Sequence, residues 1–537
     1  MQSITETTVQ RHSLRKWLWD RRSTTRLAFV MQMGKRIANA LCGLIWARLL
    51  VGAMGLEFND LFLTLKNVFS FGGLGDLGMG GAVALRVGKY LGGEKSNAGE
   101  HQIKHFLSCA RAMFLLIAGL TIIAATILSP SVLGSLGFSA SPQAGSLVMM
   151  GVMGGFMMAQ VMLMSYGANL NYACGNVVWP VLPSFLLLQL AFLGHWLLAR
   201  MQSPLWLQLL PYVFCTYVEL FLSNYYVRLT HPRLANIFPL SIDRKGTIAL
   251  LGSSFWIYLC TLGNQLYQST DGMVIKAGTA RKLFPIGTVT NYNFNYKFCE
   301  LAVFVALTAS FVSLPKITQW LHSPDSADQD RVRAEMTRLN QFQTLLGCGA
   351  ALAYLAGNDL FMKIWWGHAS TKVFPAEFMV QLGFALNMAV TASGDTSLQL
   401  SLRSGEKGIR LVGIVVAVTG LLNFGLSILA MKYGVLWGIA MATVVAQTVL
   451  MTFSSHYICK TMKLNWVHWL MRGCMVPLFA IALAGWLRYI FPPDNLTHAA
   501  ILVSSYLALF IAGAWALGIH LDLIKSEYQT LRRSIGK

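Results

Sequence analysis

Long apolar stretches recur along the whole chain and are separated by short polar segments. Fourteen of them are long enough to cross a hydrocarbon core of ~30 Å, which takes ~20 helical residues. Their approximate bounds are 27–49, 57–84, 102–128, 145–169, 175–197, 204–226, 247–270, 284–312, 337–361, 374–399, 409–431, 433–456, 466–489 and 498–520. Because lipid offers the backbone no hydrogen-bond partner, this pattern predicts an all-α polytopic membrane protein rather than a barrel of short alternating strands.

The basic residues predict the orientation of these spans. When residues within a turn of a span end are counted with the adjoining loop, 27 of the 42 Lys and Arg lie on one side and nine on the other. The richer side includes both termini, and basic loops face the cytoplasm. One loop does not fit this pattern, because Lys276, Arg281 and Lys282 lie on the predicted outer side. The later loops still alternate between more basic and less basic. We therefore expect a multi-pass membrane protein with both ends in the cytoplasm.

Composition agrees with this interpretation. Hydrophobic residues make up 55% of the 537 residues and charged residues only 12%. The net charge of +20 is explained by the topology and by anionic headgroups, so it does not indicate nucleic-acid binding. The nine cysteines form no CxxC pair, and we find no HExxH, Walker A or nucleophile-elbow motif. We expect no enzymatic activity, no metal and no cofactor.

Ionisable residues inside spans are costly in lipid, so they normally face a cavity or a partner. Three of them, Arg111, Glu219 and Arg472, lie near span ends, where snorkelling accounts for them. The other eight are Lys35, Arg36, Lys66, Lys297, Asp76, Asp271, Glu300 and Asp395.

Helical spacing places most of these eight on polar stripes. The stripes are Gln32, Arg36, Asn39 and Gly43 with Lys35 beside them; Thr261, Asn264, Gln268 and Asp271; Asn293, Lys297 and Glu300; and Asn387, Thr391 and Gly394 with Asp395 beside them. Four polar stripes favour a hydrated lumen. The alternative is hydrogen-bonding between helices, or an ion pair such as Lys297 with Glu300.

The second span contains six glycines within residues 72–81, with Asp76 among them. Each glycine weakens a helix by ~1 kcal/mol relative to alanine. In a membrane such a run allows close helix contact or local unwinding beside a cavity. Asp76 is then either a site for a cation or proton, or a hydrogen-bonded residue within a packing groove.

Short motifs resemble one family of transporters. Ala47-Arg48-Leu-Leu, Gly55-Leu-Glu57-Phe, Gly75-Asp76-Leu-Gly78-Met and Ala82-Val-Ala84-Leu-Arg86 are similar to the opening of bacterial polysaccharide flippases. Thr270-Asp271-Gly-Met-Val-Ile and Ser313-Leu-Pro315-Lys-Ile resemble later segments of that family. Its superfamily also includes the lipid II flippases and the multidrug and toxin extruders. The run Asn-Tyr-Asn-Phe-Asn-Tyr at 291–296 and the long N-terminus depart from the pattern.

The resemblance implies two six-helix lobes, 27–226 and 247–456, around a central cavity. A basic N-terminus (1–26), a cytoplasmic linker (227–246), two extra helices (457–520) and a cytoplasmic tail (521–537) complete the predicted organisation. The implied function is the movement of lipid-linked oligosaccharide between leaflets, in contact with membrane lipids and alongside a polysaccharide polymerase or glycosyltransferases.

Cations suit a diphosphate, and amides and aromatic rings suit sugars. Candidate substrate-binding residues are Lys35, Arg36, Asn39, Lys66, Asn264, Gln268, Asn293, Lys297 and Glu300. A rival is a multidrug or metabolite antiporter that couples to Na⁺ or H⁺ through Asp76, Asp271 or Asp395. A membrane-embedded polymerase is less favoured, because the outer loops near 129–144 and 271–283 lack paired carboxylates. A non-transporting scaffold would leave the polar stripes unexplained.

The predicted orientation is tested by introducing single cysteines into a cysteine-free background. Cysteines at Lys95, Ser326 and Glu406 should be shielded from an impermeant thiol reagent in intact cells, because these positions lie on the predicted inner side. Cysteines at Ser139 and Thr279 should react. Labelling at Ser326 together with protection at Thr279 would reverse the orientation of the second half of the chain.

Overall fold

The computed structural model describes residues 25–92, 97–140, 145–174, 176, 180–235, 240–321, 326–366, 376–471, 475–492 and 496–516. Its elements are helical, and no strand occurs within these ranges. The basic N-terminus up to residue 24 and the cytoplasmic tail predicted from the sequence lie outside the described residues.

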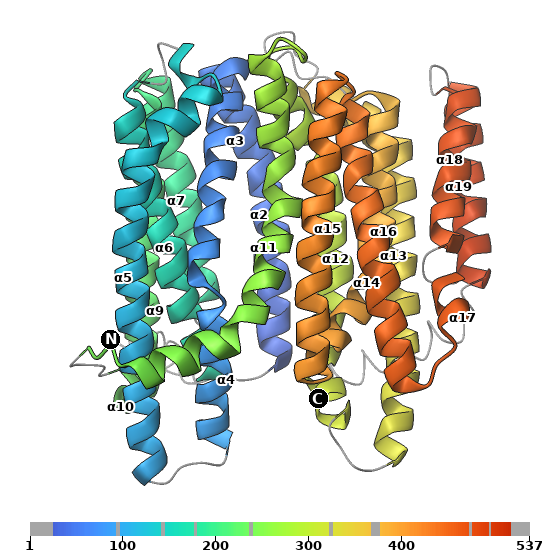
Figure 1. The fold of residues 1–537 in the computed structure, drawn as a ribbon. Helices are drawn as coiled ribbons and strands as arrows, with labels where there is room; N and C mark the ends of the chain where they lie inside the picture. Colours follow the sequence, from blue (N-terminus) through green and yellow to red (C-terminus); the bar gives the residue numbers. More distant parts are fainter. Residues whose placement is uncertain are drawn as a thin grey trace, which may run out of the picture. The chain divides into compact units, whose positions relative to one another are not determined.

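The chain divides into two compact units, Met1–Gln265 and Leu266–Lys537. The boundary falls inside one long helix, and the lobe limits predicted from the sequence remain predictions. Unit 1 contains α2 (Thr25–Met54), α3 (Leu56–Ser70), η1 (Phe71–Asp76), α4 (Met79–Gly92), α5 (Asn97–Ser135), η2 (Phe138–Ala140), α6 (Leu147–Ala173), α7 (Val181–Arg200), α8 (Leu205–Gln208), α9 (Leu210–Thr230), α10 (Pro232–Ala235) and the first part of α11 (Arg244–Ala280) (Figure 1).

Unit 2 begins within α11. It continues through α12 (Thr288–Leu321), α13 (Ser326–Trp366), α14 (Phe378–Arg403), α15 (Glu406–Lys432), α16 (Leu436–Met462), α17 (Trp466–Leu470), α18 (Val476–Ile490) and α19 (Leu496–Ala516). Every predicted span overlaps one of these helices or an interrupted series of them, so the prediction of an all-α polytopic membrane protein is confirmed.

Eight helices in the described part of the chain are long and apolar enough to cross a membrane. They are Gly34–Met54, Gly99–Ser135, Leu147–Asn171, Val181–Arg200, Leu205–Thr230, Ala327–Trp366, Lys407–Lys432 and Leu436–Met462. Val476–Ile490 and Ala500–Trp515 are shorter and also apolar. On α2, the exposed residues Ile37, Leu41, Ile45 and Leu49 recur every four positions, as a face toward acyl chains requires.

The helix α14 is long but is not among these eight, because several polar residues lie along it. Buried along it are Gln381, Asn387, Ser393, Asp395 and Thr396, together with small and apolar residues. A helix surrounded by protein can carry side chains that lipid would exclude, provided that they find hydrogen-bond partners. The polar composition of this span therefore reflects a central position within unit 2.

Several helices extend beyond the predicted spans, and at α11 the difference changes the placement of a charged residue. The sequence placed the end of the seventh span at 270, whereas α11 continues to Ala280. Lys276 is thus a buried helical residue and not part of an outer loop. Arg281 and Lys282 follow directly, and Lys282 has a positive φ of 61° at the helix end. The misplacement arose because polar residues inside a helix look like a loop in the sequence.

The glycine-rich run interrupts the second predicted span. A 3₁₀ turn, η1, separates α3 from α4, and Leu77 (φ 49°) and Gly78 (φ 73°) both adopt the left-handed conformation before α4 begins. Such φ values favour glycine because a Cβ atom strains the backbone there. The local unwinding considered from the sequence is therefore present, between α3 and α4 in Figure 1.

The same run also lets neighbouring helices approach closely. A Cβ added to Gly72 would lie 2.5 Å from Met158 Cα on α6, and one added to Gly78 would lie 2.4 Å from the Ser254 carbonyl oxygen on α11. These obstacles are backbone atoms, which cannot move aside. At Gly75 the obstacle is the mobile end of Met162, whose Cε would lie 1.9 Å away. The run thus packs against α6 and α11 within unit 1.

Gly78→Leu should therefore destabilise the protein more than Gly75→Leu. The first change meets fixed backbone and an unfavourable φ, at a cost of ~1–3 kcal/mol for overpacking alone, whereas Met162 can turn away from the second. Thermal denaturation of the purified protein in detergent measures the difference, and the variant with both changes should still insert in the membrane. Gly119→Leu is the matched control, because nothing lies within 4 Å of its added Cβ. Equal melting temperatures for Gly78→Leu and Gly119→Leu would contradict this packing.

Candidate functional site

Asp271 lies where four helices of unit 2 meet. It is on α11, and hydroxyl groups from three other helices surround its carboxylate. Tyr292 Oη on α12 donates to Oδ2 at 2.9 Å, Thr443 Oγ1 on α16 is 3.5 Å from Oδ2, and Ser427 Oγ on α15 is 3.5 Å from Oδ1. The arrangement brings together groups that are up to 172 positions apart in the sequence.

A second layer extends this site on α15. Thr443 Oγ1 also donates to the amide oxygen of Asn423 at 3.1 Å, and Asn423 and Ser427 are fully buried. One carboxylate with hydroxyl and amide oxygens is a donor set for a proton or a small hard cation, because such cations prefer oxygen ligands. In the described part of the chain no three His, Cys, Asp or Glu side chains gather as a metal cluster.

The carboxylate of Asp76 has a different environment from that of Asp271. Its Oδ1 accepts from the backbone N–H of Gly80 at 2.8 Å, near the start of α4, and its Oδ2 accepts from Ser165 Oγ on α6 at 2.7 Å. Asn169 Nδ2 donates to Ser165 in turn. A carboxylate at a helix start satisfies donors that the helix cannot satisfy itself. This geometry gives Asp76 a structural task in holding the broken helix.

Asp395 is embedded in an amide network of α13 and α14. Gln343 Nε2 donates to its Oδ2 at 3.0 Å, Gln399 Nε2 donates to its Oδ1 at 3.2 Å, and Thr396 donates to Gln343. Only 7% of Asp395 is exposed. Among the three candidate carboxylates for ion coupling, Asp271 is the one with a set of hydroxyl neighbours from several helices.

Polar residues of α2 make hydrogen bonds to residues of α7. Lys35 Nζ donates to Ser184 Oγ at 2.5 Å, and Gln189 Nε2 donates to Asn39 Oδ1 at 3.2 Å while its Oε1 accepts from Trp46. Lys35 thus lies on the same side as Asn39. Arg36 is half-buried.

The polar residues of α12 lie on two different faces of the helix. Lys297 and Glu300 form an ion pair, with 45% and 36% of their side chains exposed, and Asn293 donates to the Val289 carbonyl of its own helix. The ion pair is the alternative that the sequence left open, and its exposure leaves both groups accessible. Lys66 on α3 and Asn264 on α11 are exposed, and the side chains of Gln268 and Gln32 lie outside those described.

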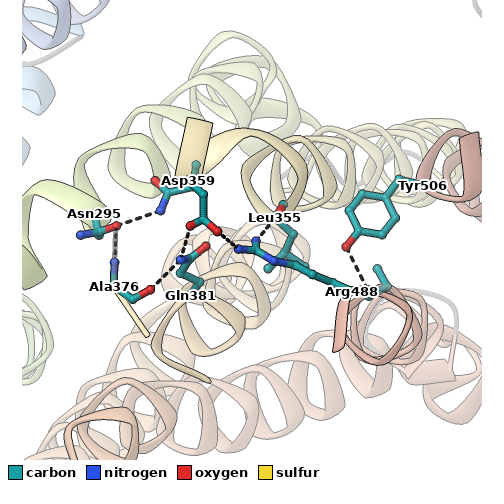
Figure 2. Close-up of polar contacts among 9 residues, drawn as sticks. Asn295, Leu355, Asp359, Ala376, Gln381, Arg488 and Tyr506 are labelled. Carbon is teal, nitrogen blue, oxygen red and sulfur yellow. Dashed lines mark hydrogen bonds and ion pairs between the residues drawn. The ribbon is translucent and has the colours of Figure 1, made fainter. Parts of the chain in front are cut away.

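Asn295, on the other face of α12, belongs to a buried network that the sequence did not indicate (Figure 2). Its Oδ1 accepts from Asn358 Nδ2 at 2.8 Å and from the Ala376 N–H at 3.0 Å. Gln381 Nε2 donates to the Ala376 carbonyl at 2.6 Å and to Asp359 Oδ1 at 2.7 Å. These bonds tie α12, α13 and the start of α14 together.

Arg488 joins α18 to this network. Its Nη2 lies 2.5 Å from Asp359 Oδ2, and its Nη1 donates to the Leu355 carbonyl. The Arg488 side chain is 6% exposed, and its guanidinium also lies over the Phe378 ring. Asp359 and Arg488 both lie within a turn of the end of a predicted span, 337–361 and 466–489, so the sequence analysis did not count them among the ionisable residues inside spans. The available signal was an arginine in the last turn of an otherwise apolar helix.

These observations define a polytopic α-helical membrane protein with polar and charged groups concentrated at contacts between its helices. No family model matches the chain, and no curated protein matches it. Among solved structures, the lipid II flippase MurJ in an inward closed conformation is similar, with 14% identity, a TM-score of 0.63, and coverage of 91% of this chain and 98% of that one.

Two further structures are similar over less of the chain. An inward-facing multidrug resistance MATE family transporter of the MOP superfamily has 12% identity, a TM-score of 0.53, and coverage of 80% and 99% of the two chains. A MATE structure in complex with MaL6 has 14% identity, a TM-score of 0.50, and coverage of 82% and 96%. The likeness shows that this chain shares the fold of these structures. Membership of the polysaccharide flippases within it remains a prediction.

The Arg488–Asp359 pair should be a strong structural link. Arg488→Met should lower the unfolding free energy by about 3 kcal/mol, because the Asp359 charge then remains without its partner at a helix contact. The double variant Arg488→Met with Asp359→Leu should recover most of that loss. Thermal denaturation in detergent provides the comparison, with Arg331→Met as a control in an exposed pair with Asp328. A double variant as unstable as the single one would argue against pairing as the source of stability.

Proposed function

We propose that this protein is a transporter that moves a lipid-linked oligosaccharide from the inner to the outer leaflet of the bacterial cytoplasmic membrane by alternating access. The observation that carries the proposal is the likeness to a lipid II flippase, which extends over 91% of the chain and 98% of that structure. The flippase-like motifs of the first 320 residues support it independently. The proposal makes the protein a transporter and not an enzyme.

The substrate of such a transporter is long and amphipathic, with a negatively charged diphosphate between lipid and sugar. Arg36 and Lys297 are the proposed contacts for the diphosphate, since a positive charge within a wet cavity binds phosphate oxygens. Lys35 and Lys66 are further cations, and Asn39, Asn264, Gln268, Asn293 and Glu300 are proposed to contact sugar hydroxyl groups. Membrane lipids surround the bundle, and a polymerase or glycosyltransferases would act before or after the transport step.

Asp271 is the proposed coupling residue. Its carboxylate is surrounded by hydroxyl groups of Tyr292, Ser427 and Thr443, which come from three helices. A proton or small cation bound there would change the attraction between these helices, and a bias of that kind is what coupling requires. Asp76 and Asp395 remain candidates, although their hydrogen bonds to Gly80, Ser165, Gln343 and Gln399 favour structural tasks.

The alternative function is a multidrug or metabolite antiporter coupled to Na⁺ or H⁺. The likeness to two MATE structures and the oxygen-lined Asp271 site favour it. Those likenesses cover 80% and 82% of this chain, whereas the flippase likeness covers 91%. The two functions differ in substrate, so a direct transport assay separates them.

The test uses the full-length protein in proteoliposomes. One arm contains a fluorescent polyprenyl diphosphate-linked oligosaccharide and an imposed Na⁺ or proton gradient, and outward movement exposes the label to an impermeant quencher. The other arm contains a cationic dye and an imposed Na⁺ or proton gradient. We expect movement of the lipid-linked sugar and none of the dye.

In the first arm, Asp271→Asn should reduce gradient-driven movement at least tenfold, because the amide cannot bind a proton or cation as the carboxylate does. Glu100→Gln is the control, since it removes a half-buried carboxylate that pairs with Lys104 on α5 in unit 1, whereas Asp271 belongs to unit 2. Dye uptake without movement of the lipid-linked sugar would establish the antiporter instead. Full activity in Asp271→Asn would remove Asp271 from the coupling mechanism.

A further inference from the structure

Unit 1 contains a cavity of about 210 Å³, and Lys35 is the one proposed substrate-binding residue among its lining residues. It lies between α2, α6, α7 and α9. Polar side chains on its wall include Lys35, Ser184, Glu219, Asn176 and Tyr226, and Leu222 is among its apolar residues. The sequence attributed Glu219 to a span end, but the structure places it on the wall of the same cavity as Lys35.

The two charged groups of this cavity have opposite signs. Lys35 donates one hydrogen bond to Ser184 Oγ and is close enough to Glu219 for electrostatic attraction. Two opposite charges on one wall favour a ligand with no net charge over an anion or a cation. The Lys35 ammonium has three N–H donors, and the bond to Ser184 uses one of them.

One residue of the cavity wall, Asn176, also contains a buried acceptor without a donor. Asn176 is 1% exposed, and its Nδ2 donates to Asn171 Oδ1 at 3.2 Å and to Thr230 Oγ1 at 2.7 Å. Its Oδ1 is buried and has no hydrogen-bond partner among the described residues. A buried polar atom in that state costs about 1–3 kcal/mol, so a ligand that donates to it gains that amount. Asn176 is therefore the second observation, besides the cavity itself, that indicates a bound molecule.

We propose that this cavity binds a single uncharged sugar ring. Hydroxyl groups both donate and accept, so one ring can accept from Lys35 while it donates to Glu219 and to Asn176 Oδ1. The apolar wall at Leu222 and Met164 suits the C–H face of a pyranose. The volume is below the ~300–1,000 Å³ of sites for drug-sized ligands, which fits one ring and not a whole oligosaccharide.

The inference rests on the proposed function where it assigns the ring to a lipid-linked oligosaccharide. The cavity would then hold one sugar of that substrate, while the diphosphate is bound elsewhere. In this arrangement Lys35 contacts a sugar, whereas the sequence analysis grouped Lys35 with the cations that suit a diphosphate.

Binding is tested with the full-length protein in lipid nanodiscs by saturation-transfer NMR. The probes are the methyl glycosides of glucose, galactose and N-acetylglucosamine, compared with glucose 1-phosphate, glucuronate and glucosamine. At least one neutral glycoside should bind, and more tightly than every charged probe. No binding by any neutral glycoside, or tighter binding of a charged probe, would overturn the proposal.

Variants assign that binding to the cavity. Lys35→Met and Glu219→Gln should each weaken it about tenfold, which is the effect of one lost hydrogen bond to a charged group. Lys104→Met and Glu100→Gln are matched controls at a half-buried pair on α5, outside the cavity lining, and should bind normally. If Lys35 and Glu219 merely neutralise each other, the double variant binds normally, whereas the proposal requires it to lose binding.

Leu222→Trp provides a variant that keeps every polar group. It fills the cavity from the apolar wall, so it should abolish glycoside binding while the melting temperature stays within a few degrees of the parent. Retained binding in Leu222→Trp would place the sugar elsewhere. If glycosides bind but lipid-linked oligosaccharide is not moved in proteoliposomes, the sugar site is supported and the proposed transport function is refuted. If that substrate is moved but no glycoside binds, the transport function is supported and the sugar site is refuted.

Discussion

The structure depends on one constraint, which is that lipid supplies no hydrogen bonds. Every backbone group within the membrane must therefore be satisfied by the protein, and helices do so within a single segment. Where the helix is broken after α3, the freed groups need local partners, and Asp76 accepts from the Gly80 N–H there. The glycines around it let α6 and α11 close over the break. The break therefore exists only because neighbouring helices and one carboxylate compensate for it.

The same constraint gives three aspartates three environments. Asp76 accepts from a backbone N–H at a helix start, Asp395 accepts from two glutamine amides, and Asp271 has hydroxyl groups as neighbours. Amide and backbone donors fix a carboxylate in one arrangement. Hydroxyl groups can both donate and accept, so they can turn their oxygens toward a bound cation. The chemistry of the neighbours, and not the residue type, is what distinguishes the proposed coupling residue Asp271.

Charge is also used to attach helices. Arg488 on α18 reaches Asp359 and the Leu355 carbonyl on α13, and Gln381 extends the contact toward α14. In a membrane, apolar contact alone gives helices little preference for each other over lipid. A guanidinium with several acceptors specifies both partner and register. The helix α18 is thus linked to the network that holds Asn295 on α12 (Figure 2).

The sequence by itself determined the fold class, the approximate positions of the spans and the existence of polar stripes, because hydropathy and helical spacing are local properties. It indicated that the glycine run would pack closely or unwind. Tertiary structure decided which neighbours each polar group meets. Glu219 faces the cavity that Lys35 lines, and Asp271 meets Thr443, 172 positions away. No spacing rule within one helix predicts such partners, because they depend on how separate helices pack.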